Sequence, residues 1–306
     1  MKKIAAIFLG TLISWSSMAR EHISIQTPYG PGHSGTAAMH KIIDQANSAQ
    51  QKYHFVLESR PGGNQSLALN HINQAPQNNL AIIAASFVDN FQNGIVRRDL
   101  YLPIWSLGDA CWAVLNLGGI SGSVLSLRGS NEIIAGSAAV GNATHLTSLI
   151  IGERLKVPVR FVAFRSANEA LINMVGNNGV TFTIDRAENF DAFKPKNDRL
   201  TMLAMSCPQR HPAYPDVPTL QEQGFETPFV FNTVVAHRDM DAKKQADIAT
   251  IMHAAAQTIG AAWILKSSGF VPPQFKGVTA RQHLDTSVNL LINLRTKYSK
   301  EISADK

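Results

Sequence analysis

The feature that most constrains the fold is an alternation of short strand-like and helix-like segments along most of the chain. Runs of apolar or alternating residues are separated by segments whose apolar residues recur at helical spacing. The predicted strands are 22–27, 53–58, 80–85, 132–136, 159–164, 180–184 and 200–206. The predicted helices are 34–46, 65–73, 144–155, 168–175, 242–259 and 280–298. Such alternation predicts parallel sheets flanked by helices, and a length of 306 residues favours two domains.

The first 19 residues have the pattern of a secretory signal peptide. Lys2 and Lys3 precede an uncharged apolar run over 4–15, and Ser17 and Ala19 place small residues before a cleavage point. The run is shorter than the about 20 residues that cross a bilayer. No Cys follows the cleavage point, which disfavours a lipid anchor, and no twin arginine precedes the run, which disfavours export with a preloaded cofactor. We therefore expect cleavage near Ala19 and a periplasmic mature protein.

Charge and cysteine content exclude several functional classes. Lys plus Arg number 28 against 22 Asp plus Glu, so removal of the two signal-peptide lysines leaves 26 against 22, a net charge of +4. The surplus forms no basic run, which argues against a nucleic-acid partner and is compatible with a small anionic ligand. Cys111 and Cys207 are the two cysteines of the sequence, too few for a disulfide framework or a Cys-rich metal site. They could oxidise together outside the cytoplasm, but the sequence does not give their separation.

The first glycine-rich loop has two interpretations. Residues 30–35 (GPGHSG) match G-x-G-x-x-G between a predicted strand and helix, and Glu58 ends the next strand, where a dinucleotide fold keeps its ribose-binding acid. A dinucleotide-binding oxidoreductase is therefore an alternative, although Pro28 and Pro31 crowd the turn. The other interpretation is that the loop binds an anion without being a dinucleotide site. Glycines let backbone N–H groups approach a ligand, and a helix N-terminus favours an anion.

Catalytic and metal-binding motifs are not evident in the sequence. The first loop forms no G-x-S-x-G elbow, and the 10 histidines show neither H-E-x-x-H nor a zinc spacing with cysteine. His145, near Asn142 and Thr144, is the best candidate for a functional histidine, and the alternative is a helix-start histidine that bonds the backbone. Asp185 closes a predicted strand, a common place for a cleft residue in parallel sheets. The alternative for Asp185 is a cap for the helix that begins at Ala187.

Four segments in register resemble the solute receptors of tripartite tricarboxylate transporters, the Bug family. Residues 27–36 (TPYGPGHSGT) resemble the family's P-[FY]-x-P-G-G-x-x-D, and 58–64 (ESRPGGN) resemble E-N-R-P-G-A-G-G-N. Residues 136–146 (GSAAVGNATHL) resemble G-S-S-G-x-G-S-x-x-H-L. Residues 215–219 (PDVPT), followed by Gly224, resemble L-P-D-V-P-T-x-x-E-x-G. The order and spacing of these segments hold over essentially the whole mature chain.

The resemblance implies an α/β, two-lobed type II periplasmic-binding-protein fold with a ligand cleft between the lobes. The predicted division is a signal peptide over 1–19, the first part of lobe 1 over 20–105, lobe 2 over 106–229, and the second part of lobe 1, with the C-terminal helices, over 230–306. Two strands near 105–117 and 229–236 would cross between the lobes.

The resemblance also implies a function. We expect a monomeric, non-catalytic receptor without cofactor or metal, which captures a small carboxylate for the permease subunits of a tripartite transporter. In the family, backbone N–H and hydroxyl groups of the cleft loops hold the carboxylate. The corresponding residues here are Tyr29, Gly30, Gly32, His33, Ser34 and Thr36 in lobe 1, Ser137, Gly141, Asn142, Thr144 and His145 in lobe 2, and Asp185 and Ser86 as further candidates. Alternatives that use the same cleft are a sensory binding protein and an exported enzyme, but no convincing nucleophile–base pair is present.

The chain departs from the family pattern at several positions. Thr36 stands where the family has the first-loop aspartate, His33 replaces its second glycine, and Ala139 replaces the glycine of G-S-S-G. Residues 76–79 read PQNN rather than P-D-G-Y, and 118–131 is shorter than the family's helix-bearing connection. Because Thr36 is neutral, these departures predict that the first loop recognises a carboxylate and not an ammonium group. They leave the identity of the carboxylate open.

Overall fold

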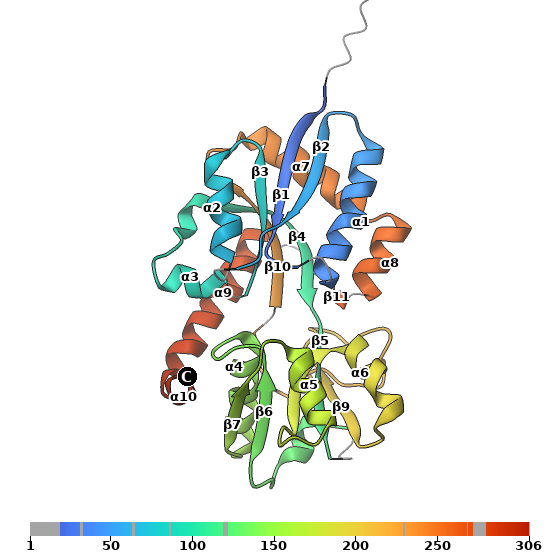
Figure 1. Cartoon of the computed structure of the whole chain (residues 1–306), viewed down its shortest axis with the longest axis vertical. Helices are drawn as coiled ribbons and strands as arrows, with labels where there is room; N and C mark the ends of the chain where they lie inside the picture. Colours follow the sequence, from blue (N-terminus) through green and yellow to red (C-terminus); the bar gives the residue numbers. More distant parts are fainter. Residues whose placement is uncertain are drawn as a thin grey trace, which may run out of the picture.

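The computed structural model describes residues 19–30, 33–62, 65–85, 87–118, 122–228, 230–267, 269–271 and 280–305. This part of the chain forms two β-sheets that lie one above the other along the long axis, each with helices packed around it (Figure 1). Residues 1–18 of the predicted signal peptide, the predicted site residues Gly32 and Ser86, and Phe229 of the second predicted crossing lie outside the described residues. The predicted α/β, two-lobed fold is confirmed.

The first sheet has six strands in the order β11-β4-β10-β3-β1-β2. The strands are β1 (Glu21–Thr27), β2 (Tyr53–Ser59), β3 (Asn79–Ala84), β4 (Tyr101–Ala110), β10 (Val230–His237) and β11 (Phe270–Val271). Strand β1 is parallel to β2 and β3, and β10 is antiparallel to β3 and β4. The helices of this half are α1 (Ser34–Ala49), α2 (Ser66–Gln74), α3 (Phe87–Gln92), the 3₁₀ helix η2 (Arg98–Leu100), α7 (Ala242–Ala256), α8 (Ile259–Ser267) and α9 (Ala280–Lys297).

The second sheet has five strands in the order β7-β6-β8-β5-β9. The strands are β5 (Trp112–Leu117), β6 (Ile133–Ser137), β7 (Val159–Ala163), β8 (Phe182–Arg186) and β9 (Leu200–Met205). Strand β6 is parallel to β7 and β8, so β6 and β8 end at the same edge of the sheet. The helices of this half are η3 (Val124–Leu127), α4 (Ala143–Leu155), α5 (Ala167–Val175), α6 (Ala187–Phe193) and η4 (Lys194–Lys196), and α10 (Ser299–Ala304) ends the described chain.

The spacing of the apolar residues in α1 explains how this helix packs. Ala38, Ile42, Ile43 and Ala46 recur at helical spacing and are all buried against the first sheet. Strand β3 is buried at each position because helices cover both faces of its sheet. The hydrophobic spacing seen in the sequence therefore places the loop between β1 and α1 at one edge of the sheet.

The chain passes between the sheets at Cys111, which separates β4 from β5. The Cys111 N–H donates to the carbonyl of Gly269, 2.7 Å away, so the passage is held to the first half beside β11. A second connection enters β10 at Val230. The limits of the two lobes stay a prediction.

A C-terminal clasp, formed by α9 and α10, joins the two halves a third time. One continuous cluster of buried side chains includes Ile83 of β3, Leu291 of α9 and Leu146 of α4. Arg295 of α9 donates from Nη1 to the carbonyl of Gly141 at 2.9 Å. Helix α9 of the first half therefore also supports a loop of the second half.

Cys111 and Cys207 form a disulfide, which settles the pairing that the sequence left open. Their Cα atoms are 4.8 Å apart, within the usual range for a disulfide, and 96 positions separate them in the chain. The bond links the passage between the sheets to the segment that follows β9, the last strand of the second sheet.

The predicted helix over 242–259 is wrong in its extent, because the chain bends by 81° between α7 and α8. Thr258 lies at the break, and its hydroxyl donates to the carbonyl of Ala255 at 2.8 Å. This bond satisfies a carbonyl that a continuing helix would have used, which is how a threonine competes with helical hydrogen bonding. Within the described ranges, no single helix is long and apolar enough to span a membrane, and only the bent pair of α7 and α8 meets that length and composition test together.

Candidate functional site: a cleft between the two sheets

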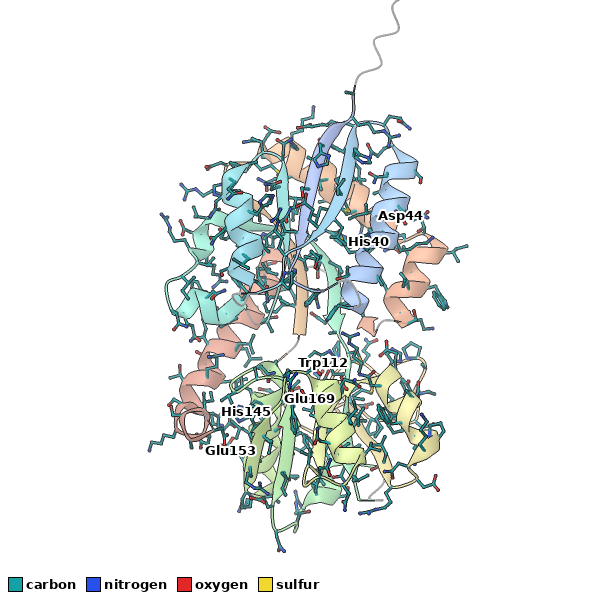
Figure 2. The ribbon with its side chains drawn as sticks, viewed as in Figure 1. His40, Asp44, Trp112, His145, Glu153 and Glu169 are labelled. Atoms are coloured by element: carbon teal, nitrogen blue, oxygen red, sulfur yellow. A yellow bond between two sulfur atoms is a disulfide. The ribbon has the colours of Figure 1, made fainter. Side chains whose placement is uncertain are left out.

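A cavity of about 300 Å³ lies between the two halves and is lined from both. Its lining residues are Tyr29, His33, Ala84, Ala85, Ala110, Asn232 and Phe270 from the first half, Trp112, Ala138, Asn142, Ala143 and Arg186 from the second, and Cys111 at the passage. Figure 2 places Trp112 at the level where the two halves meet. Of the predicted site residues, Tyr29, His33 and Asn142 are therefore brought together across the cleft.

The first loop presents two stacked rings to the cavity. The rings of Tyr29 and His33 are nearly parallel, with centroids 3.8 Å apart. His33 Nδ1 accepts a hydrogen bond from the N–H of Gly35 at 3.0 Å, so His33 is the N-cap of α1. The imidazole nitrogen therefore takes the capping role that a hydroxyl or carboxylate oxygen usually fills. A Cβ at Gly35 would lie 3.1 Å from His33 Nδ1 and 3.3 Å from Tyr29 Cε2, so a larger residue there would displace the stacked pair.

Hydrogen bonds hold the first loop in place. The Tyr29 hydroxyl donates to Oδ1 of Asn232 in β10, and the Ser59 hydroxyl donates to the carbonyl of Tyr29 at 2.6 Å. The Thr36 hydroxyl donates to the carbonyl of Gly30 at 3.0 Å. Thr36 is buried and does not line the cavity. The position where the family has an aspartate is therefore a support for the loop in this chain.

Burial and a nearby cation together set the charge of the first loop. Burial, with a smaller contribution from the positive charge of Arg186, lowers the pKa of the His33 imidazole to about 4. Burial also raises the pKa of the Tyr29 hydroxyl above its usual value, against the opposing effect of Arg186. Both rings are consequently neutral near pH 7.

The second loop that faces the cleft connects β6 to α4, and most of the polar side chains in and beside it hydrogen-bond to one another. The Asn142 Oδ1 caps α4 by accepting from the N–H of His145 at 2.8 Å, and it also accepts from the Thr144 hydroxyl at 2.7 Å. Ser137 and Thr144 are hydrogen-bonded through their hydroxyls and are both buried. A chain of hydrogen bonds therefore runs from the end of β6 to the cap residue, and only Asn142 of this chain reaches the cavity.

His145 lies behind the second loop and not in the cleft. Its side chain is 0% exposed, its ring stacks on Phe161 at 3.9 Å, and Nδ1 accepts from the N–H of Gly141 at 2.8 Å. Nε2 lies 3.1 Å from Oδ2 of Asp305, the residue that follows α10, but the pair lacks hydrogen-bonding geometry. Burial lowers the pKa of His145 to about 4. Of the two interpretations left open by the sequence, the structure favours a helix-start histidine that bonds the backbone.

Asp185 is likewise buried behind the cleft. Its Oδ1 accepts from the N–H of Arg186 at 2.8 Å, and its Oδ2 accepts from the amide of Asn189 at 2.9 Å. Burial raises the pKa of the Asp185 carboxyl, and the two hydrogen bonds and the Arg186 charge oppose that shift. The N-cap position of α6 is Arg186, so the carboxylate of Asp185 bonds the start of this helix without being its cap residue.

The structure places residues in the cleft that sequence reasoning missed, and Arg186 is the most informative of them. Arg186 ends β8, and β8 is parallel to β6, so Arg186 and the Ala138–Asn142 loop lie at the same edge of the second sheet. Sequence reasoning could have found Arg186, because Arg186 directly follows Asp185, the residue that closes a predicted strand. Asn232 and Phe270 carried no such signal, because antiparallel pairing with distant strands brings them to the cleft.

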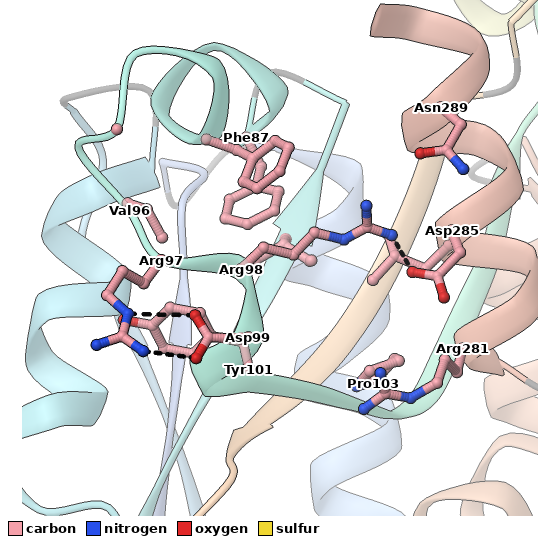
Figure 3. A pocket seen from close by; sticks show the side chains of 14 residues that line it. Phe87, Val96, Arg97, Arg98, Asp99, Tyr101, Pro103, Arg281, Asp285 and Asn289 are labelled. Carbon is pink, nitrogen blue, oxygen red and sulfur yellow. Dashed lines mark hydrogen bonds and ion pairs between the residues drawn. The ribbon is translucent and has the colours of Figure 1, made fainter.

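A larger cavity, of about 630 Å³, lies in the first half alone, between η2, β4 and α9 (Figure 3). Its charged side chains are largely paired: Arg98 contacts Asp285 of α9, and Arg97 forms an ion pair with Asp99 at 2.6 Å. We assign the candidate site to the smaller cavity because both sheets contribute to it. Among the described residues, no group of three or more His, Cys, Asp or Glu side chains is arranged to hold a metal ion.

No protein-family model and no curated protein matches the chain. Solved structures do match it. A TctC solute-binding protein from Polaromonas has a TM-score of 0.73 and 17% identity, over 89% of this chain and 98% of its own. MatC from Rhodopseudomonas palustris, with bound malate, has a TM-score of 0.67 and 16% identity, over 92% and 99%. The periplasmic binding protein BugD has a TM-score of 0.67 and 15% identity, over 92% and 98%. The chain therefore has the two-lobed fold of the TctC, MatC and BugD solute-binding proteins.

Proposed function

We propose that the protein is an exported receptor of the TctC and Bug type, which captures a small organic carboxylate in the cleft and delivers it to the permease subunits of a tripartite transporter. Export rests on the signal-peptide pattern of residues 1–19. The transporter rests on the resemblance of four sequence segments and on the fold shared with the TctC, MatC and BugD proteins. The proposal assigns the protein as a monomer without a catalytic step.

The Arg186 guanidinium in the cleft is the observation that carries the proposal. Within the described chain, Arg186 is the one lining residue with a formal charge near pH 7, and its guanidinium has no ion pair or hydrogen bond. The nearest acid in sequence, Asp185, already accepts from Asn189 and from a backbone N–H. A half-buried guanidinium without a partner favours an anion that can accept two hydrogen bonds, and a carboxylate has that geometry.

The proposal divides the predicted site residues into two roles. Tyr29, His33 and Asn142 contact the ligand directly, from opposite sides of the cleft. The supporting residues hold the loops that carry those contacts; they are Gly30, Thr36, Ser137, Gly141, Thr144, His145 and Asp185. Because the contacts come from both lobes, a bound ligand stabilises the closed arrangement by its differential affinity for that state.

Thermal unfolding in the presence of carboxylates tests the proposal. A carboxylate at about 100 times its dissociation constant stabilises the folded state by about 2.7 kcal/mol, which raises the unfolding temperature. Small-angle scattering with the same compound at saturation should show a smaller radius of gyration. A folded protein whose melting temperature no mono-, di- or tricarboxylate changes would refute the receptor assignment.

A further inference from the structure

The walls of the cleft are mostly apolar, in contrast to Arg186, the one charged side chain among its described lining residues. Five of the lining residues are alanines: Ala84, Ala85, Ala110, Ala138 and Ala143. Small side chains on both halves leave space that larger residues would fill. The about 300 Å³ available compares with about 150 Å³ for an apolar cavity that accommodates benzene, so a ring with a short substituent fits.

The larger lining residues are aromatic. Tyr29 and His33 form a flat pair from the first half, Phe270 comes from β11, and Trp112 comes from the second half. The Tyr29 hydroxyl already donates to Asn232, so Tyr29 offers the cavity mainly its ring. Aromatic side chains pack favourably on the face or edge of another ring. These walls suit a planar, apolar ligand body.

The charge of the cleft sets the charge of the ligand. Arg186 supplies one positive charge, His33 is neutral near pH 7, and no acid is among the described lining residues. A second carboxylate on the ligand would lose its hydration against alanine and aromatic walls without gaining a cation, which costs free energy. An ammonium group would face Arg186 and find no carboxylate.

We infer that the ligand is an aromatic monocarboxylate, with its carboxylate on the Arg186 guanidinium and its ring between Trp112 and the Tyr29–His33 pair. This inference rests on the proposed receptor function and specifies its substrate class. Arg186 is then a specificity residue of the second lobe, and it selects one negative charge rather than two.

Titration calorimetry with charge- and shape-matched probes tests the inference without any variant. Benzoate and phenylacetate should bind. Benzamide, which keeps the ring and lacks the charge, should bind at least about tenfold more weakly, because a charge-assisted hydrogen bond contributes more than a neutral one. Hexanoate, which keeps the charge and lacks the ring, and malate, which carries two charges, should also bind at least about tenfold more weakly than benzoate.

Variants then assign the effect to named side chains. Arg186→Gln should weaken benzoate binding at least about tenfold, and Arg186→Lys should lose less because the charge remains. Arg160→Gln is the matched control, because Arg160 lies exposed on β7 of the same sheet and pairs with Glu132. Trp112→Leu should reduce the preference for benzoate over hexanoate. A circular dichroism spectrum for each variant confirms that it is folded.

Two results separate failure of the inference from failure of the receptor function. Tighter binding of malate, adipate or hexanoate than of benzoate would overturn the inference and leave a carboxylate receptor. No binding of any of these anions by the folded protein would overturn both. Benzoate binding that Arg186→Gln and Arg160→Gln leave equally strong would also overturn the assigned role of Arg186.

Discussion

The two loops that face the cleft are built in opposite ways. In the described part of the loop after β1, the Tyr29 and His33 rings form part of the cavity wall. The loop after β6 turns its side chains toward its own framework, so that Ser137, Thr144 and His145 are all buried and hydrogen-bonded behind it. The first loop therefore contributes aromatic surface to the cavity wall, and the second contributes a hydrogen-bonded frame that holds Asn142.

A sequence motif can therefore lie beside a cavity while most of its side chains make no contact with that cavity. The segment 136–146 resembles the family pattern as closely as the first loop does, yet most of its polar side chains maintain the shape of the turn. The expected effects of substitution therefore divide: changes in the second loop alter stability first, and changes in the first loop alter binding first.

The largest expected effect on stability is at His145. His145→Ala removes a fully buried ring that stacks on Phe161 and leaves the N–H of Gly141 without its acceptor, so the free energy of unfolding should fall by about 3–5 kcal/mol. His33→Ala loses a helix cap and should cost only about 1 kcal/mol. Urea unfolding of both variants measures the two values. Equal losses would contradict the division between frame and recognition surface.

The next test of the difference between the two loops is the pH dependence of the free energy of unfolding. Burial lowers the pKa of His145 to about 4 from its ordinary value of 6.5. Between about pH 6.5 and 4 the unfolded chain binds the proton that the folded chain excludes, so the free energy of unfolding falls as the pH falls, by up to about 3 kcal/mol for this group. His145→Phe should flatten the curve in that window, measured by urea unfolding at pH 7 and 4.5.

Three other groups affect the same pH window. His33 and His211, whose pKa values are also lowered by burial, keep part of the slope in the His145→Phe variant. Asp305, which faces His145 and has a pKa raised by burial, acts in the opposite sense. A slope that His145→Phe leaves unchanged would mean that the histidine is not buried as a neutral ring.

A helix cap gives an intermediate effect and a matched control. Asn142→Ala removes the cap of α4 and should lower the free energy of unfolding by about 1 kcal/mol. Ser166→Ala removes the equivalent cap of α5, away from the cavity, and should cost a similar amount. Only Asn142→Ala should weaken ligand binding, because Asn142 lines the cleft and Ser166 does not. Calorimetry on both variants with one carboxylate decides the point.

The smallest expected effect on stability is at Gly35. Gly35→Ala improves helix propensity but brings a methyl group 3.1 Å from His33 Nδ1 and 3.3 Å from the Tyr29 ring, so the two contributions largely cancel to within about 0.5 kcal/mol. The stacked pair must shift to make room. Binding of a ring-containing carboxylate should therefore weaken while the unfolding temperature stays nearly constant. A parallel loss of both would contradict the assignment of this loop to recognition.

Sequence periodicity located most helices and the parallel strands of the two sheets, but it was insufficient for the cleft. The prediction of parallel sheets was wrong in part, because β10 pairs antiparallel with β3 and β4, and β5 pairs antiparallel with β8 and β9. Ala38, Ile42 and Ala46 revealed the buried face of α1 because helical spacing is a local property. The motif residues Tyr29, His33 and Asn142 reached the cleft because strand ends of parallel sheets share one edge. Asn232 and Phe270 could not be predicted, since their places depend on antiparallel pairing between strands far apart in the chain.

The direction in which a side chain points was also not predictable from the sequence. Asp185 and Arg186 are adjacent in β8, where neighbouring side chains point to opposite faces of the sheet. The sequence does not show which face is buried, and the structure buries the carboxylate while the guanidinium lines the cavity. His33 shows the same limit, because the identity of a cap depends on where the first helical turn begins. Spacing alone places a helix start to within a few residues and cannot make that choice.

The position of the disulfide gives the protein an order of assembly. Cys111 directly precedes β5, the first strand of the second sheet, and Cys207 follows β9, the last, so β5 to β9 all lie between the two cysteines. During synthesis from the N-terminus, the first cysteine must wait for 96 further positions before its partner emerges. Cytosolic thiols stay reduced, so closure of this bond belongs to an oxidising compartment. Formation of the bond thus requires that the two ends of the second sheet's chain segment, before β5 and after β9, have come together.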